Sequence, residues 1–350
     1  MEFSEIVMWL GFFLAAFSVV GNDVIQTLGT FLTSNEQRVS WYVLWLYAAC
    51  ILGFALFAGH QAGDISYGRL EKFQAGLQTL QYEWYYLLPP VVLLIITRMG
   101  IPVSTTFMIL TLFSLSNVPD DVSVMVSSIF DSSTKLGGMI EKSLLGYAVA
   151  FVAAVGIYMV ISRLTERFFI SNEIKPQNMW WWTVLQWLTT GFLWYQWLTQ
   201  DLANIYVYLR GGNTLSTGQF LISVLILLGL LALIFYSRGG AVQEVVRRKT
   251  NTVDIRSATF IDFIYGIVLY IFKYDNFMGM TYQFPWTGNL PMSTTWVFVG
   301  LLAGRELAIR WRLEQKITPK VWKDVTGDLG KVMLGLAVSV VLVFAIKLLS

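Results

Sequence analysis

Long apolar segments recur along almost the whole of this 350-residue chain, and they constrain its fold more than any other feature. A transmembrane helix needs about 20 consecutive, mostly apolar residues. We therefore expect an all-α polytopic membrane protein. The segments that come closest to this requirement are Ile6–Val20, Trp41–Phe57, Leu144–Ser162, Phe220–Tyr236, Phe260–Phe272 and Val332–Leu349.

Composition excludes a soluble domain of ordinary kind. Hydrophobic residues make up 56% of the chain and charged residues 13%, whereas soluble domains carry about 25% charged residues. The surplus apolar surface must face lipid, so the bilayer is the first partner that the sequence indicates. A net charge of +2 is too small to indicate a nucleic-acid partner. We expect a multi-pass protein of a plasma (inner) membrane.

Several other segments are interrupted. Trp181–Leu198 is a further candidate span, and so is Tyr85–Thr97, which we expect Pro89-Pro90 to shorten and bend. Two apolar runs, Thr106–Leu115 and Trp296–Ala303, are too short to span and each follows a polar stretch with glycine and proline. Such runs are typical of broken or re-entrant helices, which are tolerated only where protein or water covers the open backbone.

Arginine and lysine predict the orientation. They gather in three loops, at residues 163–175, 238–256 and 305–323. Cytoplasmic loops carry the excess of Lys and Arg in membrane proteins. We therefore place these loops in the cytoplasm and both chain ends outside.

Two polar motifs occur once in each half of the chain. The first is Gly21-Asn22-Asp23-Val24-Ile25-Gln26 and returns as Gln200-Asp201-Leu202-Ala203-Asn204. The second is Gly100-Ile101-Pro102-Val103-Ser104-Thr105-Thr106 and returns as Asn289-Leu290-Pro291-Met292-Ser293-Thr294-Thr295. Their order and separation agree, which predicts two structural repeats, residues 1–175 and 176–350. An odd number of segments in each half would make the repeats inverted.

The first motif pair suits a cation. Asp23 and Asp201 each follow an apolar run directly, and a carboxylate inside a membrane needs a partner. Carboxylate and amide oxygens form a cage for a hard cation such as Na⁺. We expect Na⁺ to bind at the two carboxylates. The further ligands would be the side-chain amide oxygens of Asn22, Gln26, Gln200 and Asn204. The alternative is that both carboxylates cap helices at the interface, where water solvates them.

The second motif pair suits an anion. A helix start leaves its first backbone N–H groups unpaired, and successive hydroxyls add donors without adding charge. Two such helix starts that face each other could surround one tetrahedral oxyanion. The alternative is ordinary helix capping by serine and threonine. The candidate anion ligands are Ser104, Thr105, Thr106, Ser293, Thr294 and Thr295.

These motifs resemble the signatures of the inorganic phosphate transporter family of Na⁺- or H⁺-coupled symporters. The resemblance implies inverted repeats, phosphate held by the Ser/Thr residues, Na⁺ held by the Asn/Asp/Gln residues, and no cofactor beyond the coupling ion. This chain departs from the family at four positions. Phe107 and Trp296 stand where the family usually has His, and Gln26 and Gln200 each replace an Asn. The family also contains sulfate carriers, so sulfate or another oxyanion stays an alternative substrate.

The sequence also bears on two other classes of function. A non-transporting sensor or assembly subunit on the same scaffold is the second hypothesis, because Phe107 and Trp296 could plug the anion site. An enzyme is not expected, because the sequence has no His/Cys metal cluster, no P-loop and no Gly-x-Ser-x-Gly. A homodimer is compatible with the sequence, which does not define the oligomeric state.

Overall fold

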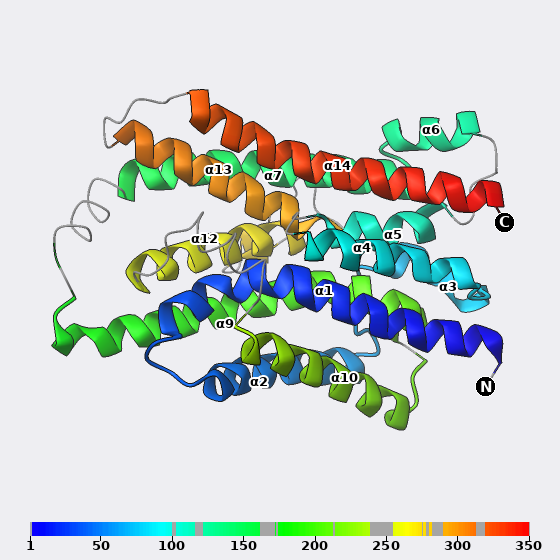
Figure 1. The fold of residues 1–350 in the computed structure, drawn as a ribbon, viewed down its shortest axis with the longest axis horizontal. Coiled ribbons are helices and arrows are strands. Elements are labelled where there is room, and N and C mark those ends of the chain that lie inside the picture. Colours follow the sequence, from blue (N-terminus) through cyan, green and yellow to red (C-terminus); the bar gives the residue numbers. More distant parts are fainter. Residues whose placement is uncertain are drawn as a thin grey trace.

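The apolar segments form helices that run side by side along the long axis of the molecule (Figure 1). Within the part of the chain described below, six helices are long and apolar enough to cross a membrane, and each overlaps one of the six expected spans. The all-α, multi-pass architecture is confirmed. The structure is a computed structural model that describes residues 2–99, 103–115, 122–161, 172, 174–212, 214–238, 255–274, 276–277, 280–281, 290–312 and 319–349.

The elements follow one another in a similar order in the two halves. The first half contains α1 (Phe3–Asn35), α2 (Trp41–Gln61), η1 (Glu71–Phe73), α3 (Gln74–Thr79), η2 (Trp84–Leu87), α4 (Leu88–Arg98), α5 (Thr105–Leu115), α6 (Val122–Phe130) and α7 (Lys135–Ile161). The second half contains α9 (Pro176–Tyr206), η4 (Val207–Gly212), α10 (Thr217–Tyr236), α12 (Ile255–Lys273), β1 (Asn276–Phe277), β2 (Met280–Thr281), α13 (Thr294–Arg312) and α14 (Pro319–Leu349).

Equivalent helices of the two halves run in opposite directions. In Figure 1, α1 runs from right to left and α9 from left to right, and the same reversal holds for α2 with α10 and for α7 with α14. The packing is reciprocal: α13 packs on α7 while α5 packs on α14, and α9 packs on α12 while α1 packs on α4. The repeats are therefore inverted. The boundary at residues 175 and 176 stays a prediction.

Two glycines show how closely the repeats correspond. A Cβ at Gly146 of α7 would lie 2.9 Å from the Met292 sulfur, and a Cβ at Gly335 of α14 would lie 2.9 Å from a methyl of Val103. Met292 and Val103 are equivalent residues of the duplicated anion motif. Each motif copy is thus pressed against a glycine of the helix behind it, which fixes the position of the helix that follows.

The interrupted segments form separate short helices. Pro89 and Pro90 lie in the first turn of α4, so they start a helix after η2 rather than bend one. Helix α5 has 11 residues, all buried, and at 1.5 Å per residue it extends only about 16 Å. Helix α13 continues to Arg312, beyond the apolar run that marked it in the sequence. Both α5 and α13 begin near the middle of the bundle (Figure 1).

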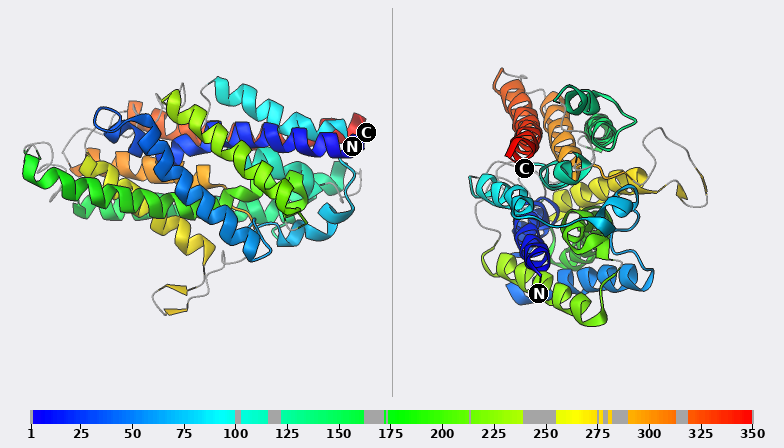
Figure 2. Two further views of the ribbon diagram at one scale, coloured as in Figure 1. Left: turned by 90° about the horizontal axis from the view of Figure 1, so that it is seen from below. Right: turned by 90° about the vertical axis from the view of Figure 1, so that its right-hand side faces the viewer.

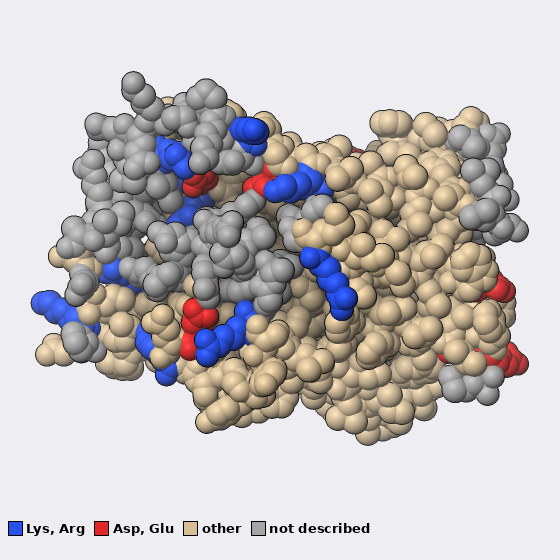
Figure 3. All heavy atoms as spheres, viewed as in Figure 1, with Lys and Arg blue, Asp and Glu red and all other residues tan. Residues whose placement is uncertain are grey.

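Both chain ends lie at the same end of the bundle, on the right in Figure 1, as the orientation argument expects. On the face drawn in Figure 3, Lys and Arg gather over the opposite, left-hand part. Of the basic residues used in that argument, Arg163, Arg167, Arg247, Arg248, Lys249 and Lys316 lie outside the described residues. The assignment of this left-hand end to the cytoplasm stays a prediction.

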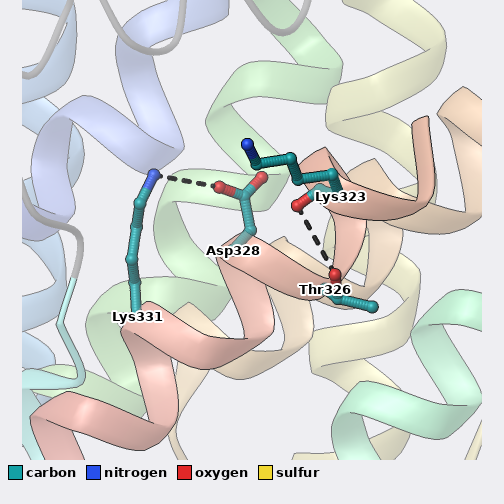
Figure 4. Close-up of polar contacts among 4 residues, drawn as sticks. All are labelled: Lys323, Thr326, Asp328 and Lys331. Atoms are coloured by element: carbon teal, nitrogen blue, oxygen red, sulfur yellow. Dashed lines mark hydrogen bonds and ion pairs between the residues drawn. The ribbon is translucent and has the colours of Figure 1, made fainter. Parts of the chain in front are cut away.

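Two peripheral features complete the fold. The strands β1 and β2 pair antiparallel, with Asn276 opposite Thr281, and project from the helices (Figure 2). Near the start of α14, Lys331 lies 3.3 Å from Asp328 on the same helix (Figure 4). This pair is partly exposed and lies within a candidate span, where mutual neutralisation lowers the cost of carrying charge.

Candidate functional site

The two anion motifs form matching helix caps. The Ser104 hydroxyl accepts a hydrogen bond from the Phe107 N–H at 3.2 Å, and the Ser293 hydroxyl accepts one from the Trp296 N–H at 3.3 Å. Serine capping, the simpler of the two interpretations, is thus present in both copies. A cap satisfies only one of the first N–H groups of a helix. The N–H groups that open α5 and α13 still point out of the helix ends.

The threonines link the two helix starts to each other. Thr106 Oγ1 lies 3.5 Å from the Met292 carbonyl oxygen, and Thr295 Oγ1 lies 3.4 Å from the Val103 carbonyl oxygen. Each copy of the motif therefore reaches across to the residue before the cap of the other copy. All six Ser/Thr side chains of the two motifs are buried. Residues 100–102 and 289 of these motifs lie outside the described residues.

The first carboxylate receives donors from α1 and α5. Asp23 Oδ1 accepts from Asn22 Nδ2 at 2.7 Å and lies 3.5 Å from Gln26 Nε2. Asp23 Oδ2 accepts from the Thr105 hydroxyl. Asn22 Nδ2 also donates to the Val103 carbonyl at 2.9 Å. The amide–Asp motif and the hydroxyl motif of the first repeat thus form one cluster.

The second carboxylate joins the same network. Asp201 Oδ1 accepts from Asn204 Nδ2 at 2.7 Å and from Thr106 Oγ1 at 3.3 Å, and the carboxylate also faces Thr294. Asn204 Nδ2 lies 3.2 Å from the hydroxyls of both Thr105 and Thr106. Because Thr105 also bonds to Asp23, a continuous path of hydrogen bonds joins the two carboxylates. Four segments that are far apart in sequence therefore meet in one buried place.

Three oxygens in this network have no hydrogen-bond partner among the described residues. They are Asn22 Oδ1 and Asn204 Oδ1, one in each copy of the amide–Asp motif, and Asp201 Oδ2. A buried acceptor without a donor costs about 1–3 kcal/mol. An amide oxygen beside a carboxylate is a ligand that Na⁺ prefers. The donor set therefore fits a hard cation beside each carboxylate.

Gln200 does not face its neighbouring carboxylate. Its Oε1 accepts from Arg69 Nη2, and its Nε2 lies 3.1 Å from the Leu269 carbonyl oxygen. The oxygen that the sequence assigned to a cation is thus engaged by a guanidinium. Gln26, the other substituted position, keeps its amide near Asp23.

Arg69 is a residue of this region that the sequence interpretation missed. It is fully buried, and burial lowers its pKa to about 10 while the charge of Asp201 opposes the shift. The guanidinium therefore stays protonated at neutral pH. The loop that carries it is folded by Asp64, which accepts from Ser66 N at 2.9 Å and also from the Gly68 N–H. Arg69 belongs to neither duplicated motif and lies in a loop, so the sequence alone did not mark it as a candidate.

Asp262 is a third buried carboxylate that the sequence interpretation missed. It lies inside the apolar α12 and accepts from the hydroxyls of Thr30 on α1 and Thr190 on α9, both at 2.5 Å. The sequence could have indicated it, because Asp262 lies inside the expected span Phe260–Phe272. A carboxylate in such a span is rare without a structural or functional reason.

Phe107 and Trp296, which each follow a cap serine by three residues, contact each other. Their ring centroids lie 5.7 Å apart in an edge-to-face arrangement, and both rings are fully buried. The indole Nε1 of Trp296 has no hydrogen-bond partner. The duplicated positions thus meet between the two helix starts.

Comparison with known proteins agrees with this architecture. No family model and no curated protein matches the sequence. A solved structure of a sodium-dependent phosphate transporter matches with a TM-score of 0.58 and 19% identity, over 99% of this chain and 97% of that chain. The chain has the fold of that transporter. The match extends over both repeats, so the inverted-repeat architecture inferred above is shared as a whole.

Proposed function

We propose that this protein is a cation-coupled symporter that carries inorganic phosphate across the membrane. The observation that carries the proposal is the single buried network of Asp23, Thr105, Asn204 and Asp201, because it joins both cation motifs to the start of α5. Thr106 and Thr295 in turn connect the start of α5 to that of α13. The likeness to a sodium-dependent phosphate transporter supports Na⁺ as the coupling ion. In this proposal the chain is a carrier and not an enzyme.

In the proposed site the anion lies between the N-termini of α5 and α13. The first N–H groups of these helices would donate to it. The hydroxyls of Thr105, Thr106, Thr294 and Thr295 would also donate to it once cations at Asp23 and Asp201 replace the hydrogen bonds that threonines donate to these carboxylates. Positive partial charge at a helix start favours an anion. Neutral donors bind without a fixed counter-charge, so the anion can also leave.

The carboxylates supply the coupling. Moving one charge across 100 mV costs about 2.3 kcal/mol, so a doubly charged anion needs two cations to become neutral. Asp23 and Asp201 offer one position each, with Asn22 Oδ1 and Asn204 Oδ1 as the neutral oxygens. Without cations, two buried carboxylates would repel the anion. Cation binding therefore has to accompany anion binding.

Uptake into proteoliposomes tests this function. The purified chain should accumulate labelled phosphate when an inward Na⁺ gradient is imposed, and much less with K⁺ or with equal Na⁺ on both sides. Asp23→Asn should lower the initial rate at least tenfold, while Thr326→Val, at an exposed position of α14, should leave it unchanged. Uptake that ignores both the gradient and Asp23→Asn would exclude the symport function.

Substrate identity is tested in the same vesicles. Unlabelled phosphate should compete with the label at concentrations at which sulfate does not. Stronger competition by sulfate would instead support the alternative oxyanion.

A sensor or assembly subunit on the same scaffold is the second candidate, because the buried rings of Phe107 and Trp296 contact each other in the first turns of the two helices that would hold the anion. Binding of phosphate without uptake would favour it.

A further inference from the structure

A polar pocket lies at the end of the bundle that carries both termini (Figure 1). The first turns of α1 line it together with η4 and the start of α10. Glu5, on its wall, precedes Asp23 by 18 residues on the continuous α1, which is about 27 Å at 1.5 Å per residue. The pocket is therefore separate from the proposed transport site. Its volume of about 220 Å³ is below the range of about 300–1,000 Å³ that holds drug-sized ligands, so it suits a smaller group.

Three charged side chains line this pocket without pairing. Glu2 and Glu5 come from the start of α1, and Arg210 comes from η4. Among the described residues, none of the three side chains has an ion-pair or hydrogen-bond partner, and Arg210 Nε is a buried donor without an acceptor. Opposite charges that share a pocket and stay apart leave room for a ligand that carries both charges. A simple dianion would be repelled by the two carboxylates.

The backbone at Arg210 is suited to glycine. Its φ is +53°, and the two residues that follow, Gly211 and Gly212, each have a φ of +81°. A residue with a Cβ is uncommon in this left-handed region. The turn itself thus gives no reason for an arginine, whereas the pocket does. A guanidinium offers a planar pair of donors that matches a phosphate group.

The pocket borders the lipid-facing surface of two helices. On α1, Phe3 and Ile6 are 60% and 49% exposed, and each directly follows one of the two glutamates. On α10, Leu221 and Leu225 are 45% and 67% exposed. The candidate spans of these helices begin at Phe3 and Thr217. The pocket therefore lies at the depth of lipid headgroups, beside surface that contacts acyl chains.

We propose that this pocket binds the headgroup of phosphatidylethanolamine, with the phosphate at Arg210 and the ammonium group at Glu2 and Glu5. A primary ammonium group has three N–H donors, which carboxylates accept. A choline headgroup has no such donor and is recognised by aromatic side chains, and none of the described residues that line this pocket is aromatic. An anionic lipid without an amine would leave both glutamates unpaired. The inference does not rest on the proposed function.

Native mass spectrometry of the purified, delipidated full chain in detergent tests this site. Phosphatidylethanolamine, phosphatidylcholine and phosphatidylglycerol with identical acyl chains are titrated separately, and the dissociation constant of the first bound lipid is measured. The ethanolamine lipid should bind at least fivefold more tightly than either of the others. Equal dissociation constants for the three lipids would overturn the proposal.

Substitutions locate the binding in this pocket. Arg210→Gly removes the guanidinium and suits the positive φ, so the Tm should change little while the ethanolamine lipid binds at least fivefold more weakly. Glu2→Gln with Glu5→Gln should abolish the preference for the ethanolamine over the choline lipid and strengthen binding of the glycerol lipid. Arg310→Gln is the matched control, because Arg310 pairs with Glu306 on α13, and it should leave all three constants unchanged. An ethanolamine preference that survives Arg210→Gly or the double glutamine variant would reject the site.

Free phosphoethanolamine distinguishes a lipid from a soluble ligand, because it carries the same two charges without acyl chains. It should displace the ethanolamine lipid only at concentrations at least a hundredfold higher, since it makes no contact with the apolar surface beside the pocket. Displacement at a concentration equal to that of the lipid would overturn the lipid assignment. None of these measurements depends on phosphate uptake, so the lipid site and the symport function can fail separately.

Discussion

Phe107 and Trp296 meet edge to face, with ring centroids 5.7 Å apart, although they lie in different repeats of the chain. Each follows its cap serine by three residues and donates its backbone N–H to that serine. The contact therefore lies between the two helix starts, where the symmetry of the repeats brings equivalent residues together. A test of this pair can therefore distinguish the proposed symporter from a non-transporting subunit on the same scaffold.

We expect the ring contact to stabilise the fold without blocking the carrier. Trp296→Phe keeps an aromatic ring and removes a buried donor that has no partner, so stability should change by less than about 1.5 kcal/mol and phosphate uptake should stay within twofold. Trp296→Ala should cost about 3–5 kcal/mol. Thermal unfolding in detergent and uptake in vesicles measure both effects. Uptake that appears only after the ring is removed would show that the pair is a plug.

Phosphate uptake should depend on the hydroxyl of Thr105 far more than on the volume of the side chain. It bonds to Asp23 and lies 3.2 Å from Asn204, so it connects the two amide–Asp motifs. Thr105→Val keeps the shape and removes that connection, and we expect phosphate uptake to fall at least tenfold. Thr105→Ser should retain most of it.

The matched control for Thr105 is Thr111→Val. Thr111 lies on the same helix, and its hydroxyl bonds to the Phe107 carbonyl at 2.6 Å and lies 3.4 Å from the Ser339 hydroxyl of α14. Its loss should leave phosphate uptake within twofold. Equal effects at the two positions would mean that Thr105 acts through helix stability and not through the site.

Much of this site could be predicted from the sequence because its residues occur in duplicated motifs. Asp23 and Asp201 stand out because a carboxylate beside an apolar run is costly, and their repetition argues against chance. The order of the motifs also predicted two repeats. Their inversion depended on the number of segments in each half, and it is visible in the structure, where α1 and α9 run in opposite directions.

The partners of these residues could not be predicted in the same way. Arg69 occurs once, in a loop between apolar segments, and only the folded chain brings it to Gln200, 131 residues away in sequence. Asp262 also occurs once, and its partners Thr30 and Thr190 come from two other helices. A duplicated motif can be recognised in the sequence, whereas the role of a single residue becomes clear only from its tertiary contacts.

Asp262 should stabilise the packing of α12 against α1 and α9. Its carboxylate accepts from Thr30 on α1 and Thr190 on α9. Asp262→Ala leaves both hydroxyls without an acceptor, and a buried polar group left unpaired costs about 1–3 kcal/mol. We expect a lower Tm in detergent for Asp262→Ala, and a smaller loss for Asp262→Asn, which keeps one acceptor oxygen. Thr326→Ala on α14 is the control, because its exposed hydroxyl bonds to the Trp322 carbonyl of the same helix, and it should leave the Tm unchanged.

Close packing of α13 on α7 should depend on two glycines one helical turn apart. A Cβ at Gly300 would lie 2.4 Å from the Tyr147 carbonyl oxygen, and one at Gly304 would lie 2.3 Å from that of Phe151. Small residues at this spacing let membrane helices approach closely. Gly300→Val must push α13 away from α7, and overpacking of this kind costs about 1–3 kcal/mol.

The same displacement should reach the site, because Thr294 and Thr295 open α13. We therefore expect Gly300→Val to lower both the Tm in detergent and the affinity for phosphate. Gly229→Ala on α10 is the control, since a Cβ there meets no atom within 4 Å, and both quantities should stay unchanged. A lower Tm with unchanged phosphate affinity would mean that the helix start of α13 is held by Ser143, which accepts from the Ser293 N–H at 3.0 Å, independently of the α7 contact further along α13.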